Sequence, residues 1–370
     1  MKKNKHIGYL RIAFLALFTI IITAESYLHV SGGMDAPSIH ALCPFGGLES
    51  LYQIFTAGSL VSKIFSGTMI LFGITLVMAL LFRRSFCGLI CPFGAIQEFF
   101  AKLGNMIFKR KFIIPAIVDA PLRYLKYIVL LITVAFAWMT AGLWMAPYDP
   151  WSAYGHLSEG LETVWSTTAV GLILLVVTII GSVLYDRFFC KYLCPMGAFY
   201  AILGKISPLK VVRNEDSCIN CGICSKVCPV NIDVMNVVEV RSAECLNCQI
   251  CVLDCPVPGA LKNKMGKKPW KPLLVIILVV ALFFGSILGF KAAGIYQLTP
   301  NQVISGELIN YGDVKGSMTI KTAAGSTSTS LEEFYSIFSI PTSVPSETKM
   351  KDISGLVPDY DFDAIKESLK

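Results

Sequence analysis

The sequence predicts a helical membrane protein with about five transmembrane helices, a small cysteine-rich α+β insert and a small C-terminal domain outside the membrane. Three observations predict this fold class. The 370 residues are 54% hydrophobic and only 15% charged, whereas soluble domains carry about a quarter charged residues. Apolar stretches close to the length of a membrane span recur along the chain. Eight of the thirteen cysteines fall within residues 218–255.

Five stretches are apolar enough to cross a bilayer core, which needs about 20 residues per helix. They are residues 7–27, 67–82, 122–145, 169–184 and 272–290. The second and fourth are short, so we expect them to extend backward into the preceding loops. No clear small-residue cleavage site follows the long first stretch, so we expect a helix there rather than a cleaved signal peptide.

Basic residues predict the orientation, because cytoplasmic loops are enriched in Lys and Arg. Three lysines stand among the first five residues, and residues 83–126 hold eight Lys or Arg. Residues 29–66 and 146–168 together hold one Lys and no Arg. We therefore expect a multi-pass membrane protein with its N-terminus and residues 205–271 in the cytoplasm and its C-terminus outside. The net charge of +7 is then a topology signal, and no nucleic-acid partner is expected.

The clustered cysteines form two copies of one motif. Residues 218–228 read CINCGICSKVC, residues 245–255 read CLNCQICVLDC, and a proline follows each. Both are C-x2-C-x2-C-x3-C-P, the run that holds 4Fe-4S clusters in bacterial ferredoxins, where the fourth cysteine of each run ligates the other cluster. Paired four-cysteine zinc sites are the alternative, but two complete runs favour clusters.

The motif thus predicts two 4Fe-4S clusters in a ferredoxin-type insert. The first would be held by Cys218, Cys221, Cys224 and Cys255. The second would be held by Cys245, Cys248, Cys251 and Cys228.

A different cysteine motif occurs twice beside the membrane. Residues 87–95 read CGLICPFGA and residues 190–198 read CKYLCPMGA, each after an apolar stretch. Because proline does not continue a helix interior, we expect the second cysteine of each pair at a helix break or a new helix start. The four thiols could converge on a further redox or metal site: Cys87, Cys91, Cys190 and Cys194. Burial as small hydrophobic residues, or a thiol/disulfide pair at a helix seam, is the alternative.

A degenerate third copy lies earlier in the chain. Residues 43–50 read CPFGGLES and match CPFGAIQE at 91–98, but Ile39 stands where the first cysteine would be. The topology puts this copy on the outer side or in a re-entrant segment, with His40 nearby. We therefore expect Cys43 to lie away from the other membrane cysteines and to be structural.

These motifs predict four regions. They are a four-helix membrane region (1–204), the dicluster insert (205–271), a fifth span (272–291) and an extracytoplasmic tail (292–370). In the tail, SLEEFYSIF at 330–338 has a capping-box pattern and one apolar face, so we expect a short helix there.

Tandem Cys-x-x-x-Cys-Pro motifs on membrane helices, combined with a dicluster ferredoxin insert, resemble the membrane polyferredoxins of anaerobic respiration. That family includes the quinol-dehydrogenase membrane subunit of periplasmic nitrate reduction and the nitrous-oxide reductase maturation protein. The resemblance covers about residues 1–290. It implies electron exchange among iron–sulfur clusters, the quinone pool and an outward-facing redox partner.

We therefore expect an electron-transfer subunit of a quinone-linked oxidoreductase, with a ferredoxin-like donor or oxidoreductase subunits as partners and no catalytic residue of its own. A redox-sensing or maturation protein without turnover is the alternative. Few ionisable residues lie at the centres of the spans, which argues against a transporter. Residues 144–156, WMAPYDPWSAYGH, are explained more simply as an aromatic belt than as a quinol slot with Asp149 or His156 as proton acceptor.

Overall fold

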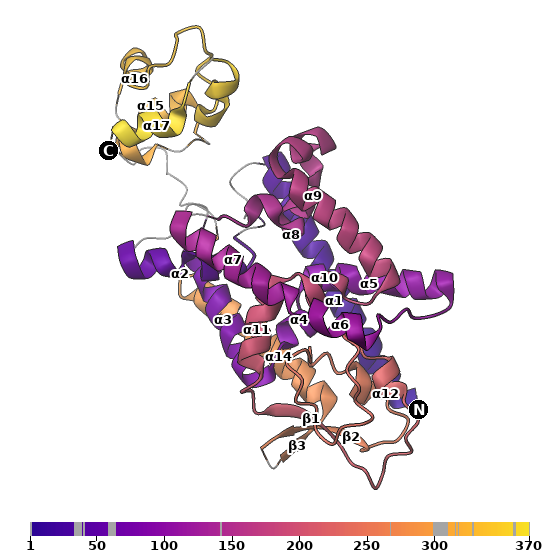
Figure 1. Cartoon of the computed structure of the whole chain (residues 1–370). Helices are drawn as coiled ribbons and strands as arrows, with labels where there is room; N and C mark the ends of the chain where they lie inside the picture. The colour runs from indigo at the N-terminus through magenta and orange to yellow at the C-terminus, as the bar shows by residue number, and fades with distance from the viewer. Residues whose placement is uncertain are drawn as a thin grey trace. The chain divides into compact units, whose positions relative to one another are not determined.

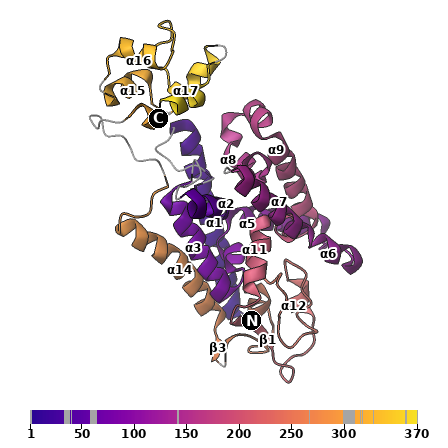
Figure 2. The same ribbon diagram turned by 60° about the vertical axis from the view of Figure 1, so that its left-hand side comes forward.

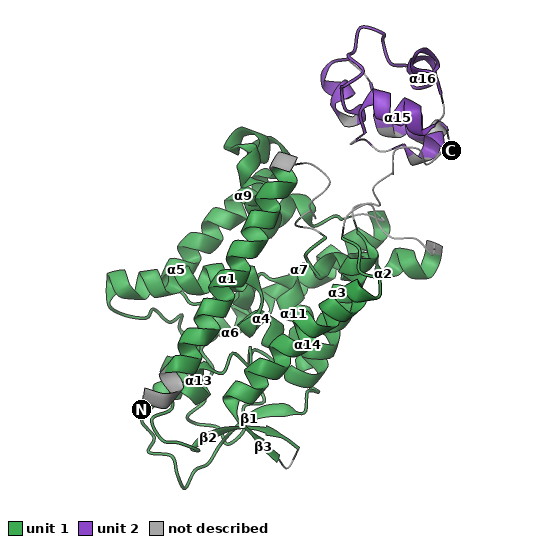
Figure 3. Ribbon diagram, turned by 180° about the vertical axis from the view of Figure 1, so that it is seen from behind, with its two compact units in different colours: residues 1–31, 36–299 green, residues 32–35, 300–370 purple. Residues whose placement is uncertain are grey.

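The computed structural model describes residues 2–32, 39, 41–57, 64–140, 143–266, 268–298, 310–314, 316, 318–327, 329–357 and 360–369. His40 lies outside these residues. The chain divides into two compact units, residues 1–31 with 36–299 and residues 32–35 with 300–370 (Figure 3). Both units are mostly helical, and the sheet belongs to the first (Figure 1).

Among the described residues, four helical segments are long and apolar enough to cross a membrane. They are His6–Val30 within α1 (Lys2–Gly32), Ala116–Thr140 across α6 (Ala116–Leu122) and α7 (Leu125–Thr140), α9 (Leu161–Leu184) and α14 (Pro272–Ala292). The expected second span is α3 (Ser66–Phe82), an apolar helix of 17 residues. At 1.5 Å per residue it is about 25 Å long, slightly less than a bilayer core of about 30 Å.

Two expected spans have different boundaries in the structure. The stretch predicted at 169–184 begins eight residues earlier, at Leu161, and Thr168 interrupts its helical geometry with φ −138° and ψ 41°. The stretch predicted at 122–145 ends at Thr140 in the structure, and the candidate span that contains it begins earlier, at Ala116 in α6. A turn at 123–124 separates α6 from α7.

The membrane part contains an internal repeat. A span is followed by a five-residue helix with the first cysteine and then by a helix that begins after the second. The first copy is α3, α4 (Ser85–Leu89) and α5 (Pro92–Phe108), and the second is α9, α10 (Phe188–Tyr192) and α11 (Pro195–Gly204). Cys91 and Cys194 are the N-cap residues of α5 and α11, so the expected helix starts are confirmed. Proline fits the first position of each helix because its fixed φ suits the first turn.

Between the two copies, the chain forms short helices: α8 (Pro150–Gly155), with the 3-10 turns η2 (Ala146–Tyr148) and η3 (Leu157–Glu159) on either side. Before the first copy, α2 (Phe45–Ala57) packs against α3 and α7. The segment that holds Cys43 therefore folds back among the membrane helices.

The insert is a small α+β structure. An antiparallel sheet has the order β1 (Leu209–Arg213), β2 (Leu261–Met265) and β3 (Lys268–Trp270), with Leu209 opposite Met265. The cysteine runs contribute the short helices α12 (Ile223–Lys226) and α13 (Ile250–Leu253). Figures 1 and 2 show this sheet at the same end of the helices as the start of α1.

The second unit has its own apolar core, centred on Ile320, Phe334 and Phe338. Its elements are η4 (Tyr311–Asp313), α15 (Ile320–Ser326), α16 (Leu331–Ile337), η5 (Met350–Gly355) and α17 (Phe362–Ser368). The helix expected at 330–338 is α16, and the Ser330 side chain accepts a hydrogen bond from the backbone N–H of Glu333, as the capping pattern predicts.

Candidate metal centres

The eight cysteines of the insert line two small cavities. One cavity, insert site 1, is lined by Cys218, Cys221, Cys224 and Cys255 together with apolar residues of the insert. The other, insert site 2, is lined by Cys228, Cys245, Cys248 and Cys251. Each cavity thus combines three cysteines of one run with the last cysteine of the other.

Left-handed backbone residues shape both cysteine loops. Positive φ angles occur on either side of the second cysteine in each run, at Asn220 (52°) and Gly222 (72°) and again at Asn247 (50°) and Gln249 (68°). Asn and Gly adopt this conformation more readily than other residues. The Gln249 side chain is fixed by hydrogen bonds, donating to Asn247 Oδ1 at 2.6 Å and accepting from Asn263 Nδ2 at 2.7 Å.

The thiols of insert site 2 suit a cationic centre. Burial raises the pKa of the Cys228 thiol to about 11 and also raises the pKa of Cys248 and Cys251. A metal ion supplies the positive charge that deprotonates a coordinating thiol. Four sulfur donors with apolar walls select soft metal centres, iron–sulfur clusters among them, so the donor set fits the predicted clusters.

Insert site 2 packs directly on the first membrane repeat. A Cβ atom added to Gly88, in α4, would lie 2.6 Å from the carbonyl oxygen of Leu246 and 3.0 Å from Cys248 Cβ. Asn247 Nδ2 also donates to the carbonyl of Phe82 at 3.0 Å. The glycine between Cys87 and Leu89 therefore allows the second cysteine run to touch the helix that carries Cys87.

A buried ion network joins the insert to the membrane helices. Arg84 and Lys126 are both fully buried, and both pair with the carboxylate of Glu244, next to Cys245. Burial alone would raise the pKa of Glu244, but the Coulombic effect of Arg84 and Lys126 outweighs it and holds the pKa below its usual value. This carboxylate is therefore ionised at neutral pH and fixes the loop before Cys245.

The two repeats are connected by a reciprocal pair of arginines. Arg84 donates to the carbonyl of Cys190 at 3.1 Å, and its counterpart Arg187 donates to the carbonyl of Cys87 at 2.8 Å. Arg187 also pairs with Glu98 at 2.7 Å. Each half-repeat thus holds the cysteine loop of the other.

This arrangement brings the four cysteines of the repeats together. The thiols of Cys91 and Cys194 both interact electrostatically with those of Cys87 and Cys190. Gln97 donates to Cys190 Sγ at 3.2 Å. All four are free thiols in the structure, with no disulfide between them. We refer to these four as the membrane thiol group.

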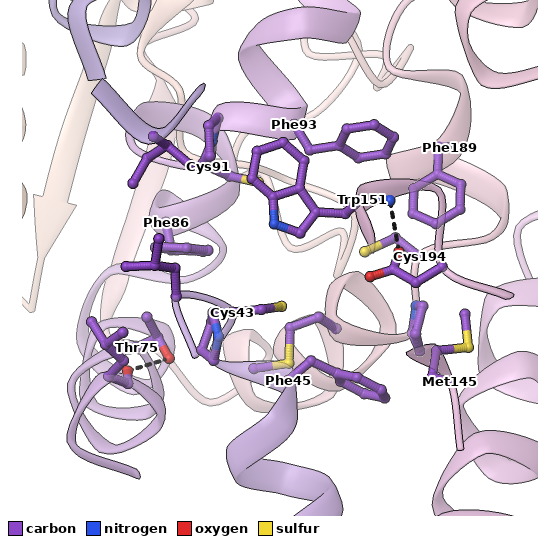
Figure 4. Close-up of a pocket in the computed structure, with 18 of the residues that line it drawn as sticks. Cys43, Phe45, Thr75, Phe86, Cys91, Phe93, Met145, Trp151, Phe189 and Cys194 are labelled. Carbon is purple, nitrogen blue, oxygen red and sulfur yellow. Dashed lines mark hydrogen bonds between the residues drawn. The ribbon is translucent and has the colours of Figure 1, made fainter. Parts of the chain in front are cut away.

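Cys43 lies beside this group, contrary to the expectation that it lies apart. A partly enclosed cavity, the thiol cavity, is lined by Cys43, Cys91 and Cys194, and aromatic residues such as Phe93 form much of its wall (Figure 4). The expectation failed because charge counts assign a loop to a side of the membrane and do not reveal that it folds back.

Asp149 also lines the thiol cavity, as the N-cap of α8, where it accepts a hydrogen bond from the Trp151 backbone N–H at 3.0 Å. His156 lies outside the residues lining this cavity and pairs with Glu159 at 2.8 Å. The aromatic stretch 144–156 thus contributes Trp151 to a buried wall as well as surface residues.

Several basic residues have a second role that the sequence did not reveal. Arg83 donates to the carbonyls of Val240 and Ser242, and Lys111 donates to the carbonyl of Cys228 at 2.7 Å. In the sequence these residues are recognisable only as topology signals. In the structure they hold the backbone around insert site 2.

Comparisons with known proteins identify the same regions. A 4Fe-4S binding domain family matches residues 67–115 and 167–214, the two membrane repeats. A 4Fe-4S dicluster domain family matches residues 210–256. No solved structure matches the chain significantly.

Three relatives show the range of similarity. YccM of Escherichia coli K12, whose name assigns it to electron transport, is 32% identical over 78% of this chain and 82% of its own length. The regulatory protein NosR of Pseudomonas aeruginosa is 28% identical over 60% of this chain and 29% of its own length. The ferredoxin-type protein NapH of Haemophilus influenzae is 28% identical over 48% of this chain and 59% of its own length.

Proposed function

This chain belongs to the membrane polyferredoxin family, and we propose that it transfers electrons in anaerobic respiration between a donor at its insert and a quinone in the membrane. The donor would be a ferredoxin-like protein or another oxidoreductase subunit. A 4Fe-4S cluster supplies one-electron redox chemistry at a potential set by its surroundings. The chain itself positions the thiols, fixes their charges and limits the access of water.

The contact between insert site 2 and the membrane repeat carries this proposal. Gly88 lies against Cys248, and Arg84 and Lys126 hold Glu244 on the membrane side of the same loop. We propose that the cysteines of insert sites 1 and 2 hold the two clusters and that the membrane thiol group forms a further redox site. Electrons would then pass from the insert into the membrane without crossing bulk solvent.

A groove between α1 and α5 is our candidate quinone site. It has a volume of about 490 Å³, with apolar walls that include Leu15 and Phe99 and with Glu98 and Lys102 among its polar lining residues. Glu98 pairs with Arg187, which in turn donates to the carbonyl of Cys87. The groove is therefore two polar contacts from the membrane thiol group, and its composition suits a lipophilic ring with a polar edge.

The test uses the purified full-length protein with its clusters. After reduction by dithionite and removal of the excess, a short-chain quinone should restore the oxidised absorbance of the clusters. An Ala16→Phe variant, which fills the groove, should slow this step. Ala13→Phe, on the same helix outside the residues lining the groove, is the matched control. Clusters that stay reduced in the wild type with quinone and with other acceptors contradict electron transfer as the function.

A sensing or maturation role without turnover is the second candidate, supported by the relative named regulatory protein NosR. It predicts clusters that reduce reversibly but never discharge to quinone. In either case we propose that the N-terminus and the insert face the cytoplasm and the C-terminus lies outside, because basic residues gather at the insert end of the helices. Labelling of single reporter sites in intact cells tests this orientation.

A further inference from the structure

Three helix starts in the membrane part share one local design. The sequence Cys-Pro-x-Gly occurs at 43–46, 91–94 and 194–197, and a helix follows in each case: α2, α5 and α11. Cys91 and Cys194 are the N-cap residues of α5 and α11, and the Cys194 sulfur accepts a hydrogen bond from the backbone N–H of Gly197 at 3.3 Å. The third copy differs slightly, because α2 begins at Phe45, two residues after Cys43.

All three sulfurs border the thiol cavity. It has a volume of about 120 Å³, and Figure 4 shows Cys43, Cys91 and Cys194 around one space with Trp151 among them. These cysteines come from three helix starts that are far apart in the sequence. Packing alone gives no reason for three equivalent thiols to meet around a cavity that is otherwise lined mainly by apolar side chains.

We infer that Cys43, Cys91 and Cys194 together bind a polynuclear iron–sulfur centre inside the membrane part, with one thiolate from each Cys-Pro-x-Gly helix start. This inference rests on the proposed function for the class of the centre. It goes further in assigning Cys43, which lies outside the residues matched by the 4Fe-4S families.

The described residues contain no ready-made site for a single ion. Among the residues that the structure describes, no three His, Cys, Asp or Glu side chains lie close enough to share one metal ion. The same holds for the cysteines of insert sites 1 and 2, whose sequence runs are those of cluster ligands. Thiolates around a cluster stand farther apart than thiolates around one ion.

The surrounding charges suit an anionic thiolate centre. Three helix N-termini, each with positive partial charge, meet at the cavity. The fully buried Arg84 and Arg187 lie behind the membrane thiol group, and both interact electrostatically with Cys190. Asp149, the one carboxylate among the described residues that line the cavity, accepts a hydrogen bond from the backbone N–H of Trp151. Asp149 and Glu49 also lie close enough to Cys43 to act electrostatically against its thiolate, so the centre would need the positive charge of its iron atoms to hold Cys43 ionised.

The remaining cysteines of the pairs, Cys87 and Cys190, lie outside the lining of the thiol cavity. Cys87 is adjacent to Gly88, which contacts Cys248, and neither Cys87 nor Cys190 is among the residues lining the thiol cavity. In the first pair, Cys87 thus lies toward insert site 2 and Cys91 toward the cavity. A centre in the cavity would be the next acceptor for an electron that leaves insert site 2.

The experiment measures iron and EPR signals in the full-length holoprotein. Wild type should contain more than the about eight iron atoms per chain that two 4Fe-4S clusters carry. Cys43→Ala should lose the excess iron while the signals of the insert clusters persist. Cys43→Ser, which keeps an oxygen donor, should retain iron with a shifted EPR spectrum. Ser50→Ala, a buried change on the helix that follows Cys43, should match wild type.

Three results would overturn the inference: about eight iron atoms in wild type, iron and spectra unchanged in both Cys43 variants, or copper or zinc in place of the excess iron. If Cys43→Ala does not fold, the spectrum of Cys43→Ser decides. The insert clusters serve as the internal reference. If the insert clusters are present and discharge to quinone but the Cys43 variants match wild type, only this inference is contradicted. If the insert clusters are absent from wild type, the proposed function is contradicted.

Discussion

The insert and the membrane repeats present cysteines by different backbone devices. In the insert, tight loops with left-handed residues at Asn220, Gly222, Asn247 and Gln249 surround two small cavities, each with four thiols. In the membrane part, Cys91 and Cys194 are the N-cap residues of helices, and three thiols border a larger cavity. The loops need residues that tolerate a left-handed backbone on either side of a cysteine, whereas the helix starts need only a proline and a small residue in the first turn.

The difference explains how the two regions are stabilised. The insert sites are built within about fifty residues of chain, so their geometry is largely local. The membrane thiols come from segments about a hundred residues apart and depend on buried cations such as Arg84 and Arg187 to hold the copies together. In the insert, we therefore expect the largest effects from substitutions of the cysteine ligands. At the junction with the membrane helices, we expect them from substitutions of the contacting residues.

The largest effect should come from a ligand of insert site 2. Cys251→Ser should remove about half of the insert iron, because one of the two clusters loses a thiolate. Cys228→Ser should give the same EPR spectrum as Cys251→Ser, although Cys228 belongs to the other run. A spectrum that instead matches Cys224→Ser would show that each run holds its own cluster, and the cavity assignment would be wrong.

The next effect should come from the buried network at the junction. Glu244→Gln leaves Arg84 and Lys126 buried without their carboxylate, and breaking a buried pair costs about 3–5 kcal/mol. The thermal midpoint of the detergent-solubilised holoprotein should fall clearly. Glu215→Gln is the matched control, because Glu215 pairs with Arg213 at an exposed position and such pairs contribute less than about 1 kcal/mol. Equal midpoints for the two variants would mean that Glu244 does not fix the insert.

Much of this structure could be predicted from local sequence patterns. The cysteine runs predicted four-cysteine sets, and the cavities of the insert contain those same sets. Proline after Cys91 and Cys194 predicted the starts of α5 and α11, because its fixed φ acts on the residue itself. The longest apolar stretches predicted helices of membrane-spanning length, because the length of an apolar stretch can also be read from a short segment of sequence.

Long-range contacts were not visible in the sequence. Arg84 and Glu244 are 160 residues apart, and the sequence around either residue gives no indication that the two are in contact. The place of Cys43 depends on α2 folding back against α3 and α7, whereas charge counts only sort loops between the two sides of the membrane. The apolar average of the stretch 122–145 likewise gave no sign that the helical segment begins at Ala116 or that a turn at 123–124 divides it.

A smaller effect should follow from filling the contact at Gly88. An alanine there would place its Cβ against Leu246 and Cys248, and overpacking of this kind costs about 1–3 kcal/mol. Gly88→Ala should lower the thermal midpoint and slow the discharge of the insert clusters to quinone. Gly73→Ala is the control, since it lies in α3 with no atom within 4 Å of the added Cβ. Unchanged discharge in Gly88→Ala would argue that electrons do not cross at this contact.

The smallest effect should come from the left-handed backbone of the first cysteine loop. Asn220 has a φ of 52°, a region that costs other residues with a Cβ about 1–2 kcal/mol. Asn220→Ala should therefore hasten cluster loss from insert site 1 in the presence of a chelator, while Asn220→Gly, which tolerates positive φ, should not. Both variants remove the exposed contact with Arg213, so the difference between them isolates the backbone. Because α5 and α11 start without a left-handed residue at the N-cap, no comparable pair of variants should exist at Cys91 or Cys194. Equal cluster loss in the two Asn220 variants would mean that the contact with Arg213, rather than the loop conformation, holds this site in shape.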